Sequence, residues 1–325
     1  MQVASSVLEL IGHTPLLHLS RIVEHGGARV LAKCEYLNPT GSLKDRTLLA
    51  MIEDAEREGT IRPGETVLIE ATSGNTGISL AALGSLKGYA VVIVMVEDTN
   101  PEIVDLIGHF GAKVVLTPSS GFSPEDLIVD GKPVGSEKAA RRLRNRITAE
   151  MLAADPRKHM LNQFANPANV RAHRQTGVEI IEQTDGKVDA LVMGVGTGGS
   201  MMGIVAALRE VQPGVRVVAV EPAEACPGSG WKHTIFGIQG ISDGVLPAIF
   251  DPGNVDEIVC VRSADAWHTA SRLAQTEGLL VGPSSGANVN AALQVAAQMR
   301  EDQVVVTILA DQAGRYLSFG LFAQD

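Results

Sequence analysis

Short apolar segments alternate with segments of helical periodicity along almost the whole chain. The apolar segments are rich in β-branched residues and are bounded by glycine, proline or polar residues, a pattern typical of strands. The predicted strands are 30–35, 67–69, 90–96, 113–116, 190–193, 216–220, 257–261 and 304–309. The predicted helices begin near Lys44, Thr76, Pro101, Asn169, Ser200, Ala264 and Ser285. This alternation predicts parallel α/β units throughout.

The length of the chain indicates about two domains. Its 325 residues are enough for two substantial cores. We expect the boundary within 155–166, after a charged helical segment and before the second set of strands. The prediction is a smaller N-terminal domain, 1–160, and a larger C-terminal domain, 161–325, each with a mostly parallel sheet flanked by helices.

One lysine, Lys44, lies at a predicted loop-to-helix junction within 38–46 (NPTGSLKDR). The proline and glycine of this stretch predict a turn, and Ser42 is a candidate N-cap. In the first turn of a helix the dipole disfavours positive charge, so a neutral amine is easier to reach, as a Schiff-base lysine requires. The alternative is an ordinary surface lysine beside Asp45.

Two more glycine-rich stretches follow predicted strands and open predicted helices. In 70–80 (EATSGNTGISL), hydroxyls, an amide and backbone N–H groups form a candidate carboxylate cradle. The stretch 192–203 (VMGVGTGGSMMG) is a candidate phosphate nest. Either could instead be a tight turn between strand and helix. Ligands of parallel sheets bind beyond the carboxyl ends of the strands, so we expect these loops to share one cleft.

The second glycine-rich stretch also fits another class of protein. Gly194, Gly196 and Gly199 have the spacing of a dinucleotide-binding loop, and Glu221 ends the next predicted strand. A nicotinamide-dependent oxidoreductase is therefore an alternative. It leaves Lys44 and the 70–80 loop unexplained.

Charge and composition narrow the function further. The net charge is −10 and no broad basic stretch is present, so we do not expect nucleic-acid binding. The three cysteines lie far apart and suggest thiols in a reducing compartment, without the spacing of a metal site. The first residues lack a signal pattern and no apolar run is long enough to cross a bilayer. We expect a cytoplasmic protein.

Eight motifs, in one order, make the chain resemble the fold-type II pyridoxal-phosphate enzymes, and among them the cysteine synthase and cystathionine β-synthase family. The motifs are 11–16 (IGHTPL), 38–46, 72–77 (TSGNTG), 162–169 (NQFANPAN), 196–200 (GTGGS), 240–247 (GISDGVLP), 282–286 (GPSSG) and 315–318 (RYLS). The resemblance implies a two-domain fold like that of the tryptophan synthase β-subunit, with pyridoxal 5'-phosphate as cofactor. It also implies a homodimer, and a segment of about 12–31 that packs on the larger domain.

The resemblance implies a role for each motif residue. Lys44 would carry the cofactor and remove the α-proton of the substrate. Asn75 would bind the ring hydroxyl, and Ser284 would face the pyridine nitrogen, which supports a neutral ring and β-elimination. The cofactor phosphate would be held by Gly196, Thr197, Gly198, Gly199 and Ser200. The substrate would be bound by Thr72, Ser73, Thr76, Gln163, Gly240, Ser242 and Asp243.

The implied reaction is β-replacement on a serine derivative through an α-aminoacrylate, catalysed by a lyase or transferase of amino-acid biosynthesis. The first choice is cysteine synthase, which makes cysteine and acetate from O-acetylserine and sulfide. Alternatives are cystathionine β-synthase, or a β-substituted alanine synthase with another donor or an amine nucleophile. Ser242 and Asp243 depart from the sulfhydrylase pattern, in which a glycine and a small residue are usual. Either the carboxylate repels anionic partners and attracts an amine, or it points to solvent or caps a turn. The segment 117–137 is either a surface loop or a lid.

Overall fold

The computed structural model describes residues 3–23, 26–123, 125–129, 132–225, 238–241 and 247–322. The chain forms two compact units, the first from 1–50 together with 163–325 and the second from 51–162. The sequence placed a boundary at residue 160 and assigned Lys44 to the N-terminal domain. In the structure Lys44 belongs to the first unit, because the two N-terminal strands pair within that unit's sheet.

The described residues of the first unit form a six-stranded sheet of order β1-β2-β12-β9-β10-β11. All neighbouring strands are parallel except β1 and β2. The strands are β1 (Leu16–His18), β2 (Arg29–Lys33), β9 (Ala190–Gly194), β10 (Arg216–Pro222), β11 (Glu257–Val261) and β12 (Val304–Ile308). The helices are α5 (Pro167–Gln183), α6 (Gly199–Val211), α7 (Ser263–Glu277) and α8 (Pro283–Ala296), with short 3-10 turns at Val7–Leu10, Glu35–Leu37, Ala223–Ala225, Pro252–Asn254 and Ala313–Arg315.

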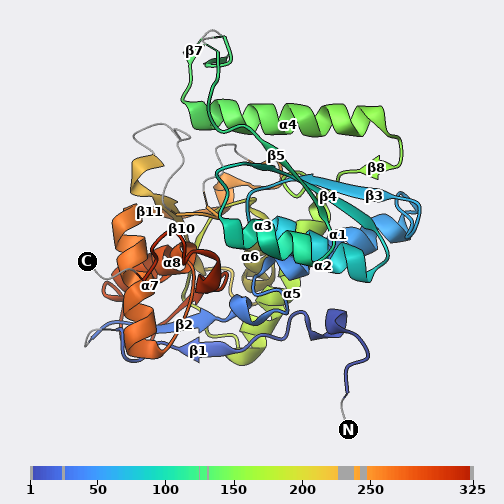
Figure 1. Ribbon diagram of the computed structural model, residues 1–325. Helices are drawn as coiled ribbons and strands as arrows, with labels where there is room; N and C mark the ends of the chain where they lie inside the picture. The colour runs from blue at the N-terminus through green and yellow to red at the C-terminus, as the bar shows by residue number, and fades with distance from the viewer. Residues whose placement is uncertain are drawn as a thin grey trace. The chain divides into compact units, whose positions relative to one another are not determined.

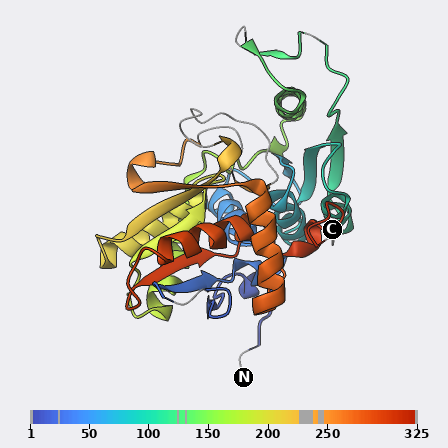
Figure 2. The ribbon, with the colours of Figure 1, turned by 90° about the vertical axis from the view of Figure 1, so that its left-hand side faces the viewer.

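Helices cover both faces of this sheet, which is why its strands are apolar at nearly every position. Along β9, Val192 packs in one core with residues of α7 and α8, while Leu191 and Met193 pack in another with residues of α5 and α6. Figure 2 shows α8, in red, lying over the strands, with α7, in orange, packed against α8. The alternation along one strand therefore joins two hydrophobic cores.

The second unit has its own parallel sheet, of order β5-β4-β3-β8 among the described residues. In Figure 1, α4 lies on one face of this sheet, and α2 and α3 lie on the other. Its strands are β3 (Val67–Ala71), β4 (Ala90–Val96), β5 (Lys113–Thr117) and β8 (Lys158–His159). Its helices are α2 (Asn75–Leu86), α3 (Pro101–His109) and α4 (Ser136–Ala154), while α1 (Lys44–Arg57) begins in the first unit and ends in this one.

The predicted strands all form, and the α/β fold with mostly parallel sheets is confirmed. The strands β1 and β8 were missed because three and two residues are too few to show a period. The segment 117–137 contains a two-stranded hairpin, β6 (Ile128–Val129) and β7 (Lys132–Pro133). Within the described part of the chain, no helix has both the length and the apolar character needed to cross a membrane.

The cysteines differ from expectation at one position. Cys34 is a buried free thiol, and burial raises its pKa to about 11. Cys260, in β11, is disulfide-bonded, so the prediction that all three cysteines are thiols is wrong for this residue. Spacing along the sequence does not reveal which cysteines a fold brings together.

Candidate active site

The loop 196–200, here called the glycine loop, connects β9 to α6 in the first unit. Gly198 precedes the helix with φ of +81°, and a Cβ there would lie 2.6 Å from Cβ of Phe250. A Cβ on Gly199 would lie 2.2 Å from Oδ1 of Asn169. Only glycine fits these two positions, and the loop presents backbone N–H groups at the start of a 13-residue helix. Such a loop fits a phosphate group.

Lys44 lies at the same edge of the same sheet. The backbone N–H of Leu43 donates to the carbonyl of Ala310, just beyond β12, at 3.0 Å. Because β12 and β9 are parallel neighbours, the segment of Lys44, beyond the end of β12, and the glycine loop, beyond the end of β9, lie at the same edge of the sheet. Ser42 Oγ accepts a hydrogen bond from the backbone N–H of Lys44 at 3.3 Å, as the capping prediction requires. The lysine side chain is half-buried.

Ser284 and Gly240 lie together in the first unit. Ser284, in the first turn of α8, is buried, and a Cβ on Gly240 would lie 3.8 Å from its Oγ. Asn288, one turn later on α8, accepts from the backbone N–H of Gly194 at 2.7 Å and donates to the carbonyl of Ile308 at 2.9 Å. The amide of Asn288 therefore ties the carboxyl ends of β9 and β12 to the helix that carries Ser284.

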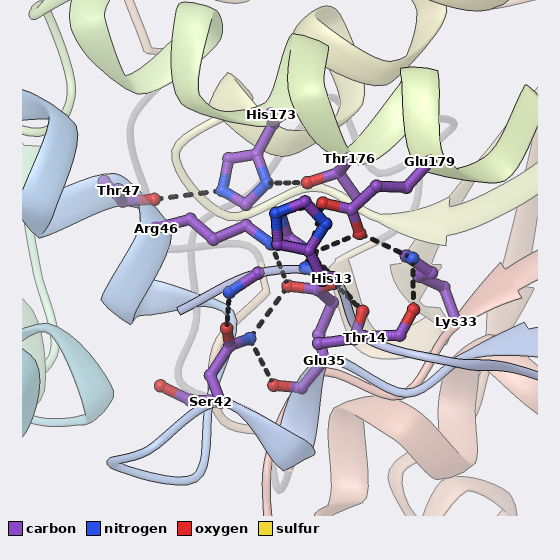
Figure 3. Close-up of polar contacts among 12 residues, drawn as sticks. His13, Thr14, Lys33, Glu35, Ser42, Arg46, Thr47, His173, Thr176 and Glu179 are labelled. Atoms are coloured by element: carbon purple, nitrogen blue, oxygen red, sulfur yellow. Dashed lines mark hydrogen bonds and ion pairs between the residues drawn. The ribbon is translucent and has the colours of Figure 1, made fainter. Parts of the chain in front are cut away.

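A buried ion-pair network that includes Arg46, two residues after Lys44, was not predicted from the sequence (Figure 3). Arg46 contacts two carboxylates, with Nε 2.7 Å from Glu35 Oε2 and Nη1 2.7 Å from Glu179 Oε1. Lys33 Nζ lies 2.7 Å from the other oxygen of Glu179, and Thr14 donates to Glu35 at 2.6 Å. Two positive and two negative groups are thus buried together. Lys33 and Arg46 both pair with Glu179, which lies more than 130 positions later, so no local sequence pattern reveals the network.

The charges of this network are compensated by their neighbours. Burial alone would raise the pKa of Glu179, but hydrogen bonds and charge from Arg46 and Lys33 outweigh burial and lower that pKa to about 2. Burial lowers the pKa of Lys33 from its ordinary value, and Glu179 opposes this effect. The network fixes the first turns of α1, and with them the backbone of Lys44.

A second buried polar chain joins α1 to the glycine loop. His173 Nε2 lies 3.0 Å from Thr47 Oγ1, and its Nδ1 lies 3.2 Å from Thr176 Oγ1 (Figure 3). Thr47 Oγ1 donates to Asn169 Oδ1 at 3.2 Å, and Asn169 Nδ2 donates to Thr197 Oγ1 at 3.0 Å. All five residues are buried. The sequence had singled out only Thr197 among them as a site residue.

In the second unit, the stretch 72–77 joins β3 to α2. Asn75 and Thr76 begin the helix, and Thr72 Oγ1 accepts from the backbone N–H of Gly74 at 3.4 Å. A Cβ on Gly77 would lie 2.9 Å from the Ile107 side chain, so glycine lets the helix pack closely. Polar groups at the N-terminus of a 12-residue helix suit a carboxylate.

Ser73 has a partner that the sequence did not indicate. Nη1 of Arg144, on α4, donates to Ser73 Oγ at 3.1 Å. Arg144 belongs to a run of basic residues on this helix, and its side chain turns toward the candidate substrate loop. Glu70, two residues before that loop, is buried, and burial raises its pKa to about 7 while the Asn162 N–H and the charge of Arg144 oppose the rise.

The remaining predicted residues are placed as follows. Gln163 is buried in the first unit, and its backbone carbonyl accepts from Asn169 at 2.8 Å. Ser242 and Asp243 lie outside the described residues. Glu221 is the next-to-last residue of β10, and burial raises its pKa to about 8.

Comparison with known proteins gives concordant matches. The sequence profile of the family described as "Pyridoxal-phosphate dependent enzyme" matches residues 7–311. A probable cysteine synthase of Bacillus subtilis is 39% identical over 99% of both chains. Cystathionine beta-synthase of Rattus norvegicus is 39% identical over 98% of this chain, which spans only 55% of that protein. The crystal structure of a cysteine synthase from Entamoeba histolytica matches with a TM-score of 0.89 and 34% identity, over 100% of this chain and 92% of that one.

The family model covers almost the whole chain. The probable cysteine synthase of Bacillus subtilis is more than 30% identical over nearly its full length. The chain therefore belongs to the pyridoxal-phosphate dependent enzyme family.

Proposed function

We propose that this protein is a pyridoxal-phosphate dependent β-replacing enzyme that makes cysteine and acetate from O-acetylserine and sulfide. One observation carries the proposal: the segment of Lys44 is hydrogen-bonded just beyond the carboxyl end of β12, and the glycine loop leaves the carboxyl end of β9, the parallel strand next to β12. The names of the relatives support the choice of substrates. A nicotinamide-dependent oxidoreductase is not supported, because the family match is to pyridoxal-phosphate dependent enzymes and that alternative gives Lys44 no role.

The residues that would hold the cofactor are Lys44, Asn75, Ser284 and the glycine loop, Gly196, Thr197, Gly198, Gly199 and Ser200. Pyridoxal phosphate, when bound, supplies an electron sink for the carbanion formed at Cα of the amino acid. The backbone N–H groups of the glycine loop would bind its phosphate, together with the dipole of α6. Ser284 would offer the pyridine nitrogen a hydroxyl rather than a carboxylate, which suits β-elimination.

Further residues would bind the substrate and move its protons. Thr72, Ser73, Thr76 and Gln163 would bind and orient the substrate carboxylate, and Gly240, Ser242 and Asp243 are further proposed substrate-binding residues. Lys44 would take the proton from Cα, the C–O bond at Cβ would break with loss of acetate, and hydrosulfide would form the new C–S bond at Cβ. Lys44 would then return the proton to Cα.

A second nucleophile is supported by one observation. The identity to cystathionine beta-synthase of Rattus norvegicus equals that to the probable cysteine synthase, at 39% each. Homocysteine in place of sulfide is therefore the alternative, followed by a small amine.

The experiment is a comparison of nucleophiles with one donor. Purified protein with pyridoxal phosphate is given O-acetylserine and, in separate reactions, sulfide, homocysteine or a small amine, and the products are identified by mass spectrometry. The expected main product is cysteine, and Lys44→Ala abolishes it while Lys113→Ala, at an exposed position, does not. A main product of cystathionine would move the assignment to the alternative, and no product from O-acetylserine would refute both.

The remaining parts of the proposal concern assembly and location. We propose a cytoplasmic homodimer that binds no nucleic acid. Sedimentation equilibrium should give twice the mass of the chain, and a single-chain mass would contradict the dimer. Cell fractionation tests the location.

A further inference from the structure

The hydrogen bonds of Asn169 determine which way its side-chain amide faces. The carbonyl of Gln163 can only accept, so the atom 2.8 Å from it is the amide nitrogen, Nδ2. The second proton of Nδ2 is donated to Thr197 Oγ1 at 3.0 Å. The opposite atom, Oδ1, therefore accepts from Thr47 Oγ1 at 3.2 Å. Since Thr197 already accepts from Asn169, its own hydroxyl proton points elsewhere.

The same reasoning assigns the protons of His173. Thr47 gives its only hydroxyl proton to Asn169, so it accepts from His173, and the imidazole carries its proton on Nε2. Nδ1 then accepts from Thr176 Oγ1 at 3.2 Å. Burial holds the pKa of His173 well below its ordinary value. The positive charges of Arg46 and Lys44 lower this pKa further, and the negative charge of Glu179 opposes them. A neutral imidazole with one tautomer follows.

The hydrogen-bonded chain from Thr176 through His173, Thr47 and Asn169 to Thr197, here called the relay, is also held by packing. A Cβ on Gly199 would lie within 2.6 Å of all three terminal side-chain atoms of Asn169, so the amide lies directly against the glycine loop. A Cβ on Gly203, one turn later, would lie 2.3 Å from the backbone carbonyl of Val170. The helices α5 and α6 therefore approach closely, and Asn169 has little room to turn.

We propose that Asn169 is a positioning residue that directs the hydroxyl proton of Thr197 toward the cofactor phosphate, and that Thr47 and His173 hold Asn169 in this orientation. The relay connects the helix of Lys44 with the glycine loop, so the two ends of the cofactor are placed by one chain of hydrogen bonds. The inference rests on the proposed role of the glycine loop and adds three residues to it.

The test is Asn169→Asp in the holoenzyme without substrate. The carboxylate has nearly the same shape but cannot donate, so Thr197 turns its proton to the new oxygen and away from the phosphate. We expect the ³¹P resonance of the bound cofactor to shift. We also expect the affinity for pyridoxal phosphate to fall about 10- to 100-fold, as for a buried group left without its partner.

Asn290→Asp is the matched control. Asn290, on α8, also donates from Nδ2 to a threonine hydroxyl, that of Thr269, at 3.1 Å, but this contact joins α8 to α7. Its substitution should leave the ³¹P resonance and the cofactor affinity as in the parent. Circular dichroism checks that both variants fold.

If Asn169→Asp does not fold, a second pair of variants tests whether Thr47 holds Asn169 in its orientation. Thr47→Val removes the hydroxyl that holds Asn169, and Thr47→Ser keeps it, so the valine should weaken cofactor binding and the serine should restore it. A folded Asn169→Asp protein, or a Thr47→Val protein, with parental affinity and ³¹P resonance would overturn the proposal. These measurements use no amino acid, so a protein that binds the cofactor but makes no cysteine contradicts only the proposed function.

Discussion

Nη1 of Arg46 lies 2.7 Å from Oε1 of Glu179, although 133 positions separate the two residues in the chain. Both side chains are at most 5% exposed. The contact joins the first turn of α1, next to Lys44, to the middle of α5. It adds a contact between opposite charges to the apolar packing that also joins the N-terminal 50 residues to the C-terminal part of the first unit.

Replacing Arg46 by methionine should destabilise the protein strongly. Glu35 and Glu179 would remain buried with one cation, Lys33, and an uncompensated buried charge costs about 3–5 kcal/mol. The matched control is Arg57→Met at the other end of α1, where the arginine is 71% exposed and pairs with Asp54. That change should cost less than about 1 kcal/mol. Urea unfolding followed by circular dichroism measures both, and equal losses would argue against the network.

Stability at acidic pH should depend on Glu179. Its pKa is lowered from an ordinary 4.5 to about 2, so its stabilising effect is present above pH 4.5 and is lost as the pH falls toward 2. The difference corresponds to about 3 kcal/mol at most. Glu179→Gln should be less stable than the parent at pH 7 but should lose less stability on acidification. A parallel pH dependence of the two free energies of unfolding would contradict this origin.

Glu70 should have the opposite dependence. Its pKa is raised from 4.5 to about 7, so the folded state is favoured below pH 4.5 and loses this stability as the pH rises through 7. Among the described residues, its buried Oε2 accepts no hydrogen bond. Glu70→Gln should gain up to about 3 kcal/mol over the parent between these pH values. Glu65→Gln, at an exposed position, is the control, and an equal gain there would refute the assignment.

Arg144 should affect substrate binding if Ser73 binds the substrate carboxylate. The guanidinium donates to Ser73 Oγ and orients it, so Arg144→Ala should raise KM for the amino-acid substrate about 5-fold, the equivalent of one hydrogen bond, with little change in kcat. Arg146 is the matched control, because it lies on the same helix, is 63% exposed and pairs only loosely with Glu150 at 3.9 Å. Steady-state kinetics distinguish the two, and an unchanged KM in Arg144→Ala would remove Arg144 from the site.

Some features were predictable because they are local. Each of three features depends on residues within about ten positions: the turn before Lys44, the glycine loop and the strand-to-helix junctions. At Gly198 the backbone has φ of +81°, a conformation that favours glycine, and the sequence has glycine there. Most predicted strand and helix ends agree with the structure to within two residues, because apolar runs and turn residues mark them. The eight motifs also identified the family, which the comparisons confirm.

Other features appeared only in the tertiary structure. Neither Asn169 nor His173 carries a local signal for its role, since each acquires it from partners on α1 and the glycine loop. Arg144 belongs to a basic run like many solvated helix faces, and only the fold turns it toward Ser73.

The sequence alone predicted the α/β class, which the structure confirms, and proposed Lys44 as the reactive lysine and the glycine loop as the phosphate site, because backbone conformation and helix dipoles arise from neighbouring residues. The tertiary structure decided how Lys44 is supported, through Arg46, Glu35 and Glu179. It also assigned residues 1–50 to the unit that carries the glycine loop. Buried charges and amides require partners that compensate the loss of water, and such partners come from any part of the chain that the fold brings within hydrogen-bonding distance.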